Sequence, residues 1–331
     1  MSGTKEKAIN LLRRTLPVWE WFLAPFTLLG ALLFALIRRG GIERLPLTRR
    51  ILLQVGVFPI SRHYYEPQFD HRAMRRPLDA ERPLPGIDWN EAEQIELLGR
   101  FHYADELLQF PERPRDGRIE FHYDNAMFPP GDAEILYSMV RHFRPGSVIE
   151  IGSGNSTLMV VNALQKNAEE EQGYRCRHIC IEPYEMPWLE QTGVTVLRER
   201  VESVDRELFA TLQAGDILFI DSSHMIRPQG DVLAIYLEIL PLLRPGVLVH
   251  IHDIFSPQDY PREWVVDEVK FWNEQYLLEA FLTMNREFRV VAGLSYLKLN
   301  HYDLLCACCP VFARQGGGPG SMWLRREQAR P

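Results

Sequence analysis

The sequence predicts an α/β fold with a mostly parallel sheet, an antiparallel C-terminal strand and a separate N-terminal hydrophobic helix. From residue 132 onward, short apolar runs alternate with amphipathic segments, a pattern typical of a parallel sheet covered by helices. The first apolar run leads into a turn with two glycines, VIEIGSGNST at 148–157. Near the N-terminus, residues 21–37 contain no charged residue. The chain therefore combines an α/β domain with a hydrophobic segment.

The composition is that of a globular protein with an acidic balance. The 331 residues, of which 46% are apolar, supply enough material for one large domain or two small ones. The 37 basic and 44 acidic residues leave a net charge of -7, which excludes nucleic acid as the main partner because phosphate binding requires a basic surface. Five closely spaced cysteines favour a reducing compartment over a disulfide framework.

The hydrophobic segment at 21–37 predicts a membrane anchor. It has the minimum length for a span, and residues 16–39 as a whole are expected to contact the membrane. A cleaved signal peptide lacks support because no small-residue cleavage site follows, while a helix lying on the protein or in the membrane interface stays open. The larger arginine cluster on the C-terminal side favours a membrane-associated protein with its catalytic domain in the cytoplasm.

Three regions are expected: an anchor helix with its basic flank at 1–50, a cap segment on the substrate side at 51–130, and the α/β domain at 131–331. Asn90 is a suitable N-cap for a helix up to about Leu108. The α/β domain should hold seven strands and a long helix at 262–284, with a Cys- and Gly-rich connection before the last strand. The expected strands are 148–151, 177–181, 194–197, 217–220, 247–251, 288–292 and 322–325. Because no clear helix separates the last two strands, they are predicted to be antiparallel.

The glycine turn favours a cationic ligand. In a nicotinamide-binding unit the fingerprint is G-x-G-x-x-G, and here Thr157 stands at the third glycine position. Glu150 precedes the two glycines, and an anion at this point would repel a pyrophosphate and attract a cation.

A sulfonium compound meets that requirement, and the chain resembles the class I S-adenosylmethionine-dependent methyltransferases. The resemblance rests on VIEIGSGNST, HICIEPYE, GDILFIDSSH, RPGVLVHIHDIF and GSMWLRR, which follow one another between residues 120 and 326. It implies a Rossmann-like methyltransferase fold with a seven-stranded sheet and S-adenosylmethionine as the cofactor.

The resemblance also implies which residues hold the cofactor. Glu150, Gly152, Ser153 and Gly154 would line its methionine end, and Glu182 would accept hydrogen bonds from the ribose hydroxyls. The helix start at Asn155, Ser156 and Thr157 would offer donors to the cofactor carboxylate, and Asp221 completes the expected set.

The chemical centre is expected where the fourth and fifth strands end. The segments IDSSH and HIHDI resemble the sugar and antibiotic O-methyltransferases, in which a D-x-x-H segment supplies an acid and a base. By this resemblance His224, as a neutral imidazole, is the catalytic base beside Asp221. Asp221 and Asp253 would hold a divalent metal ion with His252, where the pattern expects a glutamate. That difference leaves open manganese, iron, zinc or no metal. His250 either joins the site or is a buried histidine.

These residues predict a membrane-anchored methyltransferase that acts on an oxygen of a small, glycosylated or lipid-linked acceptor. Two alternatives stay open. The first is a metal-dependent hydroxylase or hydrolase that uses Asp221, His252 and Asp253. The second is a non-catalytic membrane scaffold. No motif in 61–130 or 256–272 identifies the acceptor.

Overall fold

The computed structural model describes residues 2–328, and these form two compact units that divide between Arg75 and Arg76. The expected boundaries at 50/51 and 130/131 remain predictions. In the larger unit, the segment before residue 130 packs on the sheet domain, because Phe101, Leu107 and Phe121 lie in the same hydrophobic cluster as the first strand's Val148.

The smaller unit begins with the long helix α1 (Ser2–Gly40), followed by α2 (Pro46–Val55) and two 3-10 turns, η1 (Ile42–Arg44) and η2 (His71–Ala73). Within residues 15–40 of α1, an 18-residue window has a mean hydropathy of 1.9, and none of that window is buried. Arg38 and Arg39 lie in the last turn, where a positive charge complements the helix dipole. The helix is long and apolar enough to cross a bilayer, which by itself is weak support for membrane association.

The larger unit is built around one seven-stranded sheet in the order β3-β2-β1-β4-β5-β7-β6. Its strands are β1 (Ser147–Ile151), β2 (Arg177–Ile181), β3 (Thr195–Leu197), β4 (Ile217–Ile220), β5 (Leu248–His252), β6 (Phe288–Gly293) and β7 (Ser321–Arg326). The first five pair in parallel, whereas β7 runs antiparallel to both β5 and β6. The predicted fold class, including the antiparallel C-terminal strand, is confirmed.

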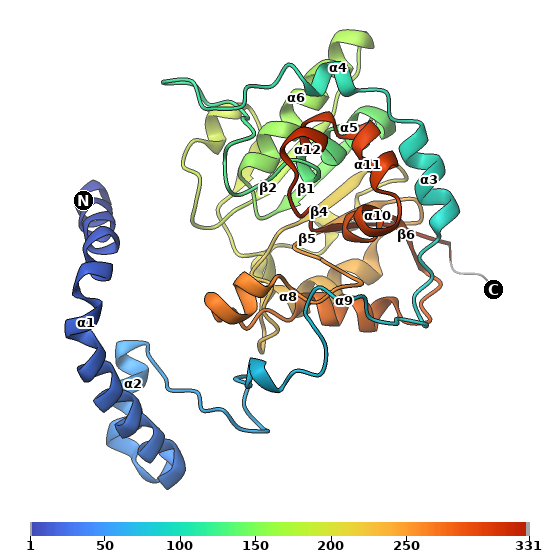
Figure 1. Cartoon of the computed structure of the whole chain (residues 1–331). Helices are drawn as coiled ribbons and strands as arrows, with labels where there is room; N and C mark the ends of the chain where they lie inside the picture. The colour runs from blue at the N-terminus through green and yellow to red at the C-terminus, as the bar shows by residue number, and fades with distance from the viewer. Residues whose placement is uncertain (1, 329–331) are drawn as a thin grey trace. The chain divides into compact units, whose positions relative to one another are not determined.

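Helices cover both faces of this sheet, with α5 and α6 on one side and α8 and α9 on the other (Figure 1). The helical segments of this unit are α3 (Glu91–Gly99), α4 (Ala104–Leu107), α5 (Asp132–Phe143), α6 (Asn155–Glu170), η3 (Leu189–Thr192), η4 (Val201–Ser203), α7 (Glu207–Ala210), α8 (Asp231–Ala234), η5 (Ile235–Ile239), η6 (Leu240–Leu242), η7 (Glu263–Asp267), α9 (Glu274–Leu282), α10 (Leu294–Asn300), α11 (Tyr302–Cys308) and α12 (Pro310–Gln315). Every residue of β1 is buried, and its neighbours Val148 and Ile149 belong to different hydrophobic clusters. This two-sided burial explains why the strand is apolar apart from Ser147 at its start and Glu150.

Three helical predictions differ from the structure. The helix expected from 90 to about 108 is two helices, α3 and α4, separated by residues 100–103. The helix expected over 262–284 is interrupted between η7 and α9, where Val269 has a positive φ of 55°. The connection expected to be irregular before β7 contains α10, α11 and α12, because buried Leu294, Leu305 and Phe312 give these short segments a face to pack.

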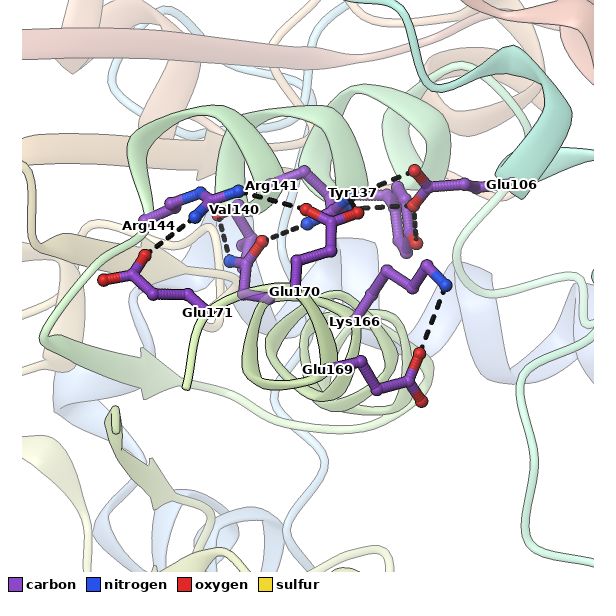
Figure 2. A network of polar contacts seen from close by, with 10 residues as sticks. Glu106, Tyr137, Val140, Arg141, Arg144, Lys166, Glu169, Glu170 and Glu171 are labelled. Atoms are coloured by element: carbon purple, nitrogen blue, oxygen red, sulfur yellow. Dashed lines mark hydrogen bonds and ion pairs between the residues drawn. The ribbon is translucent and has the colours of Figure 1, made fainter. Parts of the chain in front are cut away.

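A polar network fixes α4 against α5 and α6 (Figure 2). The Arg141 guanidinium on α5 lies 2.9 Å from a Glu106 oxygen on α4 and 2.5 Å from a Glu170 oxygen on α6. The Tyr137 hydroxyl also donates to Glu106, at 2.5 Å, and Arg141 donates to Asn167. Because the Arg141 side chain is only 2% exposed, these acceptors compensate a buried positive charge.

Candidate active site

The glycine turn lies where three parallel strands end side by side. Gly152 has φ = 79°, and its N–H donates to the Ile181 carbonyl at 3.0 Å. The Asp221 N–H donates to the Ile151 carbonyl at 2.8 Å. A Cβ on Gly152 would lie 1.8 Å from the Asp221 carbonyl oxygen. Glycine is therefore required here both for its left-handed backbone and for the close approach of the chain after β4.

A pocket of about 740 Å³ opens at this edge of the sheet. Of the predicted cofactor residues, Gly152, Glu182 and Asp221 line it, whereas Glu150 and residues 153–157 are not among its lining residues. The other side of the pocket is formed by residues 183–185, 200–202, 222–223 and 227–231. The structure thus brings the ends of β1, β2 and β4 to one cavity, as the parallel topology requires.

The Glu150 carboxylate is fully buried and bound by this chain's own groups. Its Oε2 accepts hydrogen bonds from the Ser156 and Thr157 hydroxyls, each at 3.0 Å, and its Oε1 pairs with His178 Nε2 on β2. The sequence analysis expected this charge to attract a cationic ligand and did not identify His178. The pairing register contained the signal, because Glu150 lies opposite Cys180 and His178 is two residues earlier on the same face.

Glu182 lies at the end of β2 with its orientation fixed. One carboxylate oxygen accepts from the backbone N–H groups of Tyr184 and Glu185, both at 2.9 Å, and the other lies 3.4 Å from the Ser153 nitrogen. The Arg198 guanidinium bonds to the Glu182 and Glu185 carbonyls, which holds the loop around this carboxylate. The geometry suits the predicted role of binding vicinal hydroxyls, and that role stays a prediction.

The start of α6 is occupied by internal hydrogen bonds. Asn155 is the first helical residue, and the Gly154 N–H donates to Thr157 Oγ1 at 3.1 Å. The hydroxyl protons of Ser156 and Thr157 go to Glu150, so these two side chains do not offer donors to a ligand in this arrangement. Of the two kinds of donor predicted to bind a cofactor carboxylate, hydroxyls and backbone N–H groups, the backbone N–H groups at the turn remain.

The predicted chemical centre is a cluster of His224 with three carboxylates. His224 Nε2 lies 3.2 Å from both Asp221 Oδ1 and Asp253 Oδ2, and Nδ1 lies 2.8 Å from Glu274 Oε2. Asp221 follows β4, Asp253 follows β5, and Glu274 begins α9. The Asp221 side chain is 34% exposed and Glu274 is completely buried, so the cluster extends from the pocket rim into the interior. The sequence analysis did not identify Glu274, because fifty residues separate it from His224 and no motif links them.

These carboxylates change the expected charge of His224. Burial alone lowers the pKa of His224, but hydrogen bonds to Asp221 and Glu274 raise that pKa well above its ordinary value. Burial raises the pKa of Asp221, and the nearby His252 and His224 outweigh this and lower it to about 2. The predicted neutral imidazole is therefore not the form that this arrangement favours, because three carboxylates surround one ring.

The residue types at the centre fit a divalent cation, for which the ligand atoms of Asp221, His224 and Asp253 all lie within 4.8 Å of one another. The predicted set contained His252 in place of His224. His252 Nε2 lies 3.8 Å from Asp253, and its Nδ1 is 3.3 Å from His250 Nε2. His250 is fully buried and stacks on Phe219 with 4.3 Å between ring centroids, which agrees with a buried histidine. Burial also holds the pKa of His250 well below its ordinary value.

Comparison with known proteins gives a family match in this region. Residues 149–254 match the family model described as a methyltransferase domain. The matched range begins in β1 and ends just after Asp253, so it contains the glycine turn and most of the cluster around His224. An uncharacterized protein from Archaeoglobus fulgidus is 27% identical over 173 residues, which cover 48% of this chain and 76% of that protein.

Several solved structures are similar over most of the chain at low sequence identity. An O-methyltransferase from Bacillus cereus in complex with SAH is 13% identical with a TM-score of 0.36, covering 72% of this chain and 91% of that one. The O-methyltransferase TomG from Streptomyces achromogenes, in complex with SAM, is 14% identical with a TM-score of 0.35, covering 70% and 90%. At these scores the similarity carries no separate argument about the site.

Proposed function

We propose that this chain, which contains a class I S-adenosylmethionine-dependent methyltransferase domain, methylates a hydroxyl oxygen of a small, glycosylated or lipid-linked acceptor at a membrane surface. The proposal depends on one observation, that Asp221 belongs both to the pocket and to the cluster around His224. Asp221 lines the 740 Å³ pocket together with Gly152 and Glu182, and it also contacts His224 in the carboxylate cluster. A donor in the pocket would therefore have its reacting end beside the cluster.

The pocket residues suit the cofactor in charge and shape. Glu182 presents a fixed carboxylate to hydroxyl groups, and the Gly152 turn brings the end of β1 to the pocket wall. Because Glu150 is already paired with His178, we assign it to holding the turn. The negative charge that would face the sulfonium is then that of Asp221 on the pocket wall.

Methyl transfer is an in-line displacement in which the acceptor oxygen forms a bond to the methyl carbon as the bond from carbon to sulfur breaks. The cationic sulfonium becomes a neutral thioether, and the hydroxyl proton must leave the oxygen. His224 Nε2 takes this proton when the ring is in its neutral form, which is the minor form because Asp221 and Glu274 raise the pKa of His224. Asp221 and Asp253 are the residues that would hold a divalent cation beside His224, and such a cation would when bound supply positive charge that favours an acceptor alkoxide. The chain's own contribution is alignment of the two reactants.

The membrane part of the proposal rests on α1. Its apolar window of residues 15–40 is unburied, and large side chains such as Trp21 and Leu36 are exposed by 90% and 68%. A helix with this surface favours a membrane location. Arginines on its C-terminal side favour placing the catalytic domain in the cytoplasm, where a lipid-linked acceptor would be within reach of the enzyme.

The test uses the full chain in detergent. Calorimetry should show saturable binding of S-adenosylmethionine and none of NAD⁺, and a Glu182→Gln variant should weaken binding about tenfold through loss of charge-assisted hydrogen bonds. The protein is then incubated with methyl-labelled cofactor and membrane extract, and the label is followed into the lipid and the aqueous fractions. Binding of NAD⁺ alone would overturn the proposal.

Two other outcomes would support the alternatives. Stoichiometric iron or zinc without any affinity for S-adenosylmethionine would support a metal-dependent hydroxylase or hydrolase. Cofactor binding without transfer of label to either fraction, in membranes from the native source, would support a scaffold with an idle site.

A further inference from the structure

The segment that contains His224 is held by the residues that begin α9. His224 has a left-handed backbone, with φ = 57°, and its carbonyl accepts hydrogen bonds from the Asn273 and Glu274 N–H groups at 3.0 and 3.2 Å. The Asn273 side chain accepts in turn from the Ile226 N–H at 2.7 Å. A left-handed conformation is unfavourable for a residue with a side chain. These hydrogen bonds stabilise the His224 backbone in that conformation.

The same segment fixes the imidazole ring. Glu274 Oε2 lies 2.8 Å from Nδ1, and the Trp272 ring lies against the imidazole with 4.5 Å between centroids. With Nδ1 donating to Glu274, Nε2 is directed toward Asp221 and Asp253. Rotation of the ring would remove both contacts, so the contact at Nδ1 determines what the other ring nitrogen faces.

A fully buried carboxylate needs compensation, and the fold provides two sources. Glu274 is the first residue of the nine-residue helix α9, where the partial positive charge of the helix N-terminus favours an anion. The second source is His224 itself. Glu274 is thus placed where its charge can be retained without solvent.

We propose that Glu274 is the positioning residue of this enzyme, which orients His224 for proton transfer without touching the acceptor or the cofactor. The assignment of His224 to methyl transfer rests on the proposed function. The geometric part, that Glu274 holds Nδ1 and thereby directs Nε2, does not. A carboxylate behind a functional histidine fixes the ring orientation whether the other nitrogen takes a proton or binds a metal.

A neighbouring glutamate gives a matched control. Glu279 lies on the same helix, is also buried, and pairs with Arg82 and the Ser256 hydroxyl, away from His224. Glu279→Gln also removes a buried carboxylate charge from α9, at a position that does not contact His224. An effect shared by Glu274 and Glu279 variants is therefore an effect on the helix, whereas an effect specific to Glu274 is an effect on His224.

The experiment is nitrogen-15 NMR of the full chain in detergent with labelled histidines, in which His224→Gln identifies the His224 signals. We expect a slowly exchanging Nδ1 proton in the wild type. Glu274→Gln should move this signal because a neutral acceptor forms a weaker hydrogen bond, and Glu274→Ala should abolish its protection from exchange. Glu279→Gln should leave it unchanged. An unaltered Nδ1 signal in Glu274→Ala, or the same change in Glu279→Gln, would overturn the proposal.

A kinetic measurement on the same proteins completes the test. Glu274→Gln should lower the rate of methyl transfer 10- to 100-fold, on the order of effects seen for carboxylates behind functional histidines, with cofactor affinity changed less than about twofold. If the wild type fails to bind S-adenosylmethionine, the proposed function fails, while the NMR result still decides whether Glu274 positions His224. A rate unaffected by Glu274→Gln contradicts the positioning role in catalysis.

Discussion

Two buried pairs of glutamate and histidine lie in the same domain, and they differ in what surrounds them. Glu150 on β1 pairs with His178 on β2 and is also bound by two hydroxyls, so both of its oxygens are used inside the fold. Glu274 pairs with His224, whose second nitrogen faces Asp221 and Asp253 at the pocket rim. The first pair is closed within the protein, whereas the second leads out to solvent.

The difference shows that burial and charge alone do not mark a functional site. Both histidines are nearly inaccessible, at 8% exposure for His178 and 3% for His224. What distinguishes His224 is that its neighbours include Asp221, which belongs to the wall of a pocket. We therefore assign a structural role to Glu150 and His178, and a chemical role to His224 and its carboxylates.

The largest effect is expected from a substitution that breaks the pair of Glu274 and His224, which leads to the pocket. His224→Gln should reduce methyl transfer about 10³-fold, within the range for loss of a general base, and leave cofactor affinity within a few-fold. The measurement is label transfer from S-adenosylmethionine into membrane extract, with calorimetry for affinity. His178→Gln serves as the control and should retain more than a tenth of the rate. Equal losses in both variants would erase the distinction between the pairs.

The closed pair should instead contribute to stability. His178→Phe leaves the buried Glu150 carboxylate without its histidine partner, and we expect a loss of about 3 kcal/mol in the free energy of unfolding. Denaturation by urea measures this loss. The double variant Glu150→Gln with His178→Phe removes the uncompensated charge and should recover more than half of it. A double variant as unstable as His178→Phe would show that packing, and not charge, is responsible.

Gly152 lies between Glu150 of the closed pair and the pocket, where the chain after β1 approaches Asp221 closely. Gly152→Ala places a Cβ against the Asp221 carbonyl, so we expect it to cost about 2 kcal/mol more than the backbone strain alone. Gly173→Ala is the matched control, because Gly173 also has a positive φ, of 93°, and no atom lies within 4 Å of its Cβ position. Urea denaturation compares the two. Equal stability losses would show that the close approach to Asp221 is unimportant.

The smallest expected effect concerns the Arg141 network, an ion-pair system that ties α4 to α5 and α6 (Figure 2). Burial alone raises the pKa of Glu106, but hydrogen bonds from Arg141 and Tyr137 outweigh this and lower it. A lowered pKa gives stability that is present above the unfolded-state value, near 4.3, and that is lost as the pH falls through the folded-state value.

Glu106→Gln should therefore cost about 1 kcal/mol at pH 7 and progressively less as the pH falls below about 4. Urea denaturation of both proteins across this pH range measures the difference. Arg100, which forms an exposed ion pair with Glu96, provides the control, since Arg100→Gln should change stability by less than about 0.5 kcal/mol at any pH. A Glu106→Gln difference that does not vary with pH would contradict the charge-based explanation.

Much of the fold was predictable because its elements carry local patterns. Short, largely apolar runs marked all seven strands, and the helices between the first five strands implied parallel pairing. The insertion of β7 between β5 and β6 is not encoded in any segment, because it depends on which sheet edge the last strand meets. The same holds for α10 to α12, whose short sequences become helical where buried side chains such as Leu305 and Phe312 pack on the domain.

The site was predictable where residues follow strand ends. Asp221, His224 and Asp253 meet as expected, since parallel strands end at one edge of the sheet. Glu274 and His178 were not predicted. Glu274 reaches the site from a helix fifty residues away, and the role of His178 depends on the register between β1 and β2.

The sequence by itself determined the alternation of strands and helices, the requirement for glycine after β1, and the set of acidic and histidine side chains at the sheet edge. Only the tertiary structure decided which acid each histidine faces. It pairs Glu150 inward with His178, and it places Asp221 and Glu274 against His224, where they raise its pKa. The reason is physical: propensity and apolar pattern act along the chain, whereas charge and hydrogen bonding depend on distances of about 3 Å between groups brought together by packing.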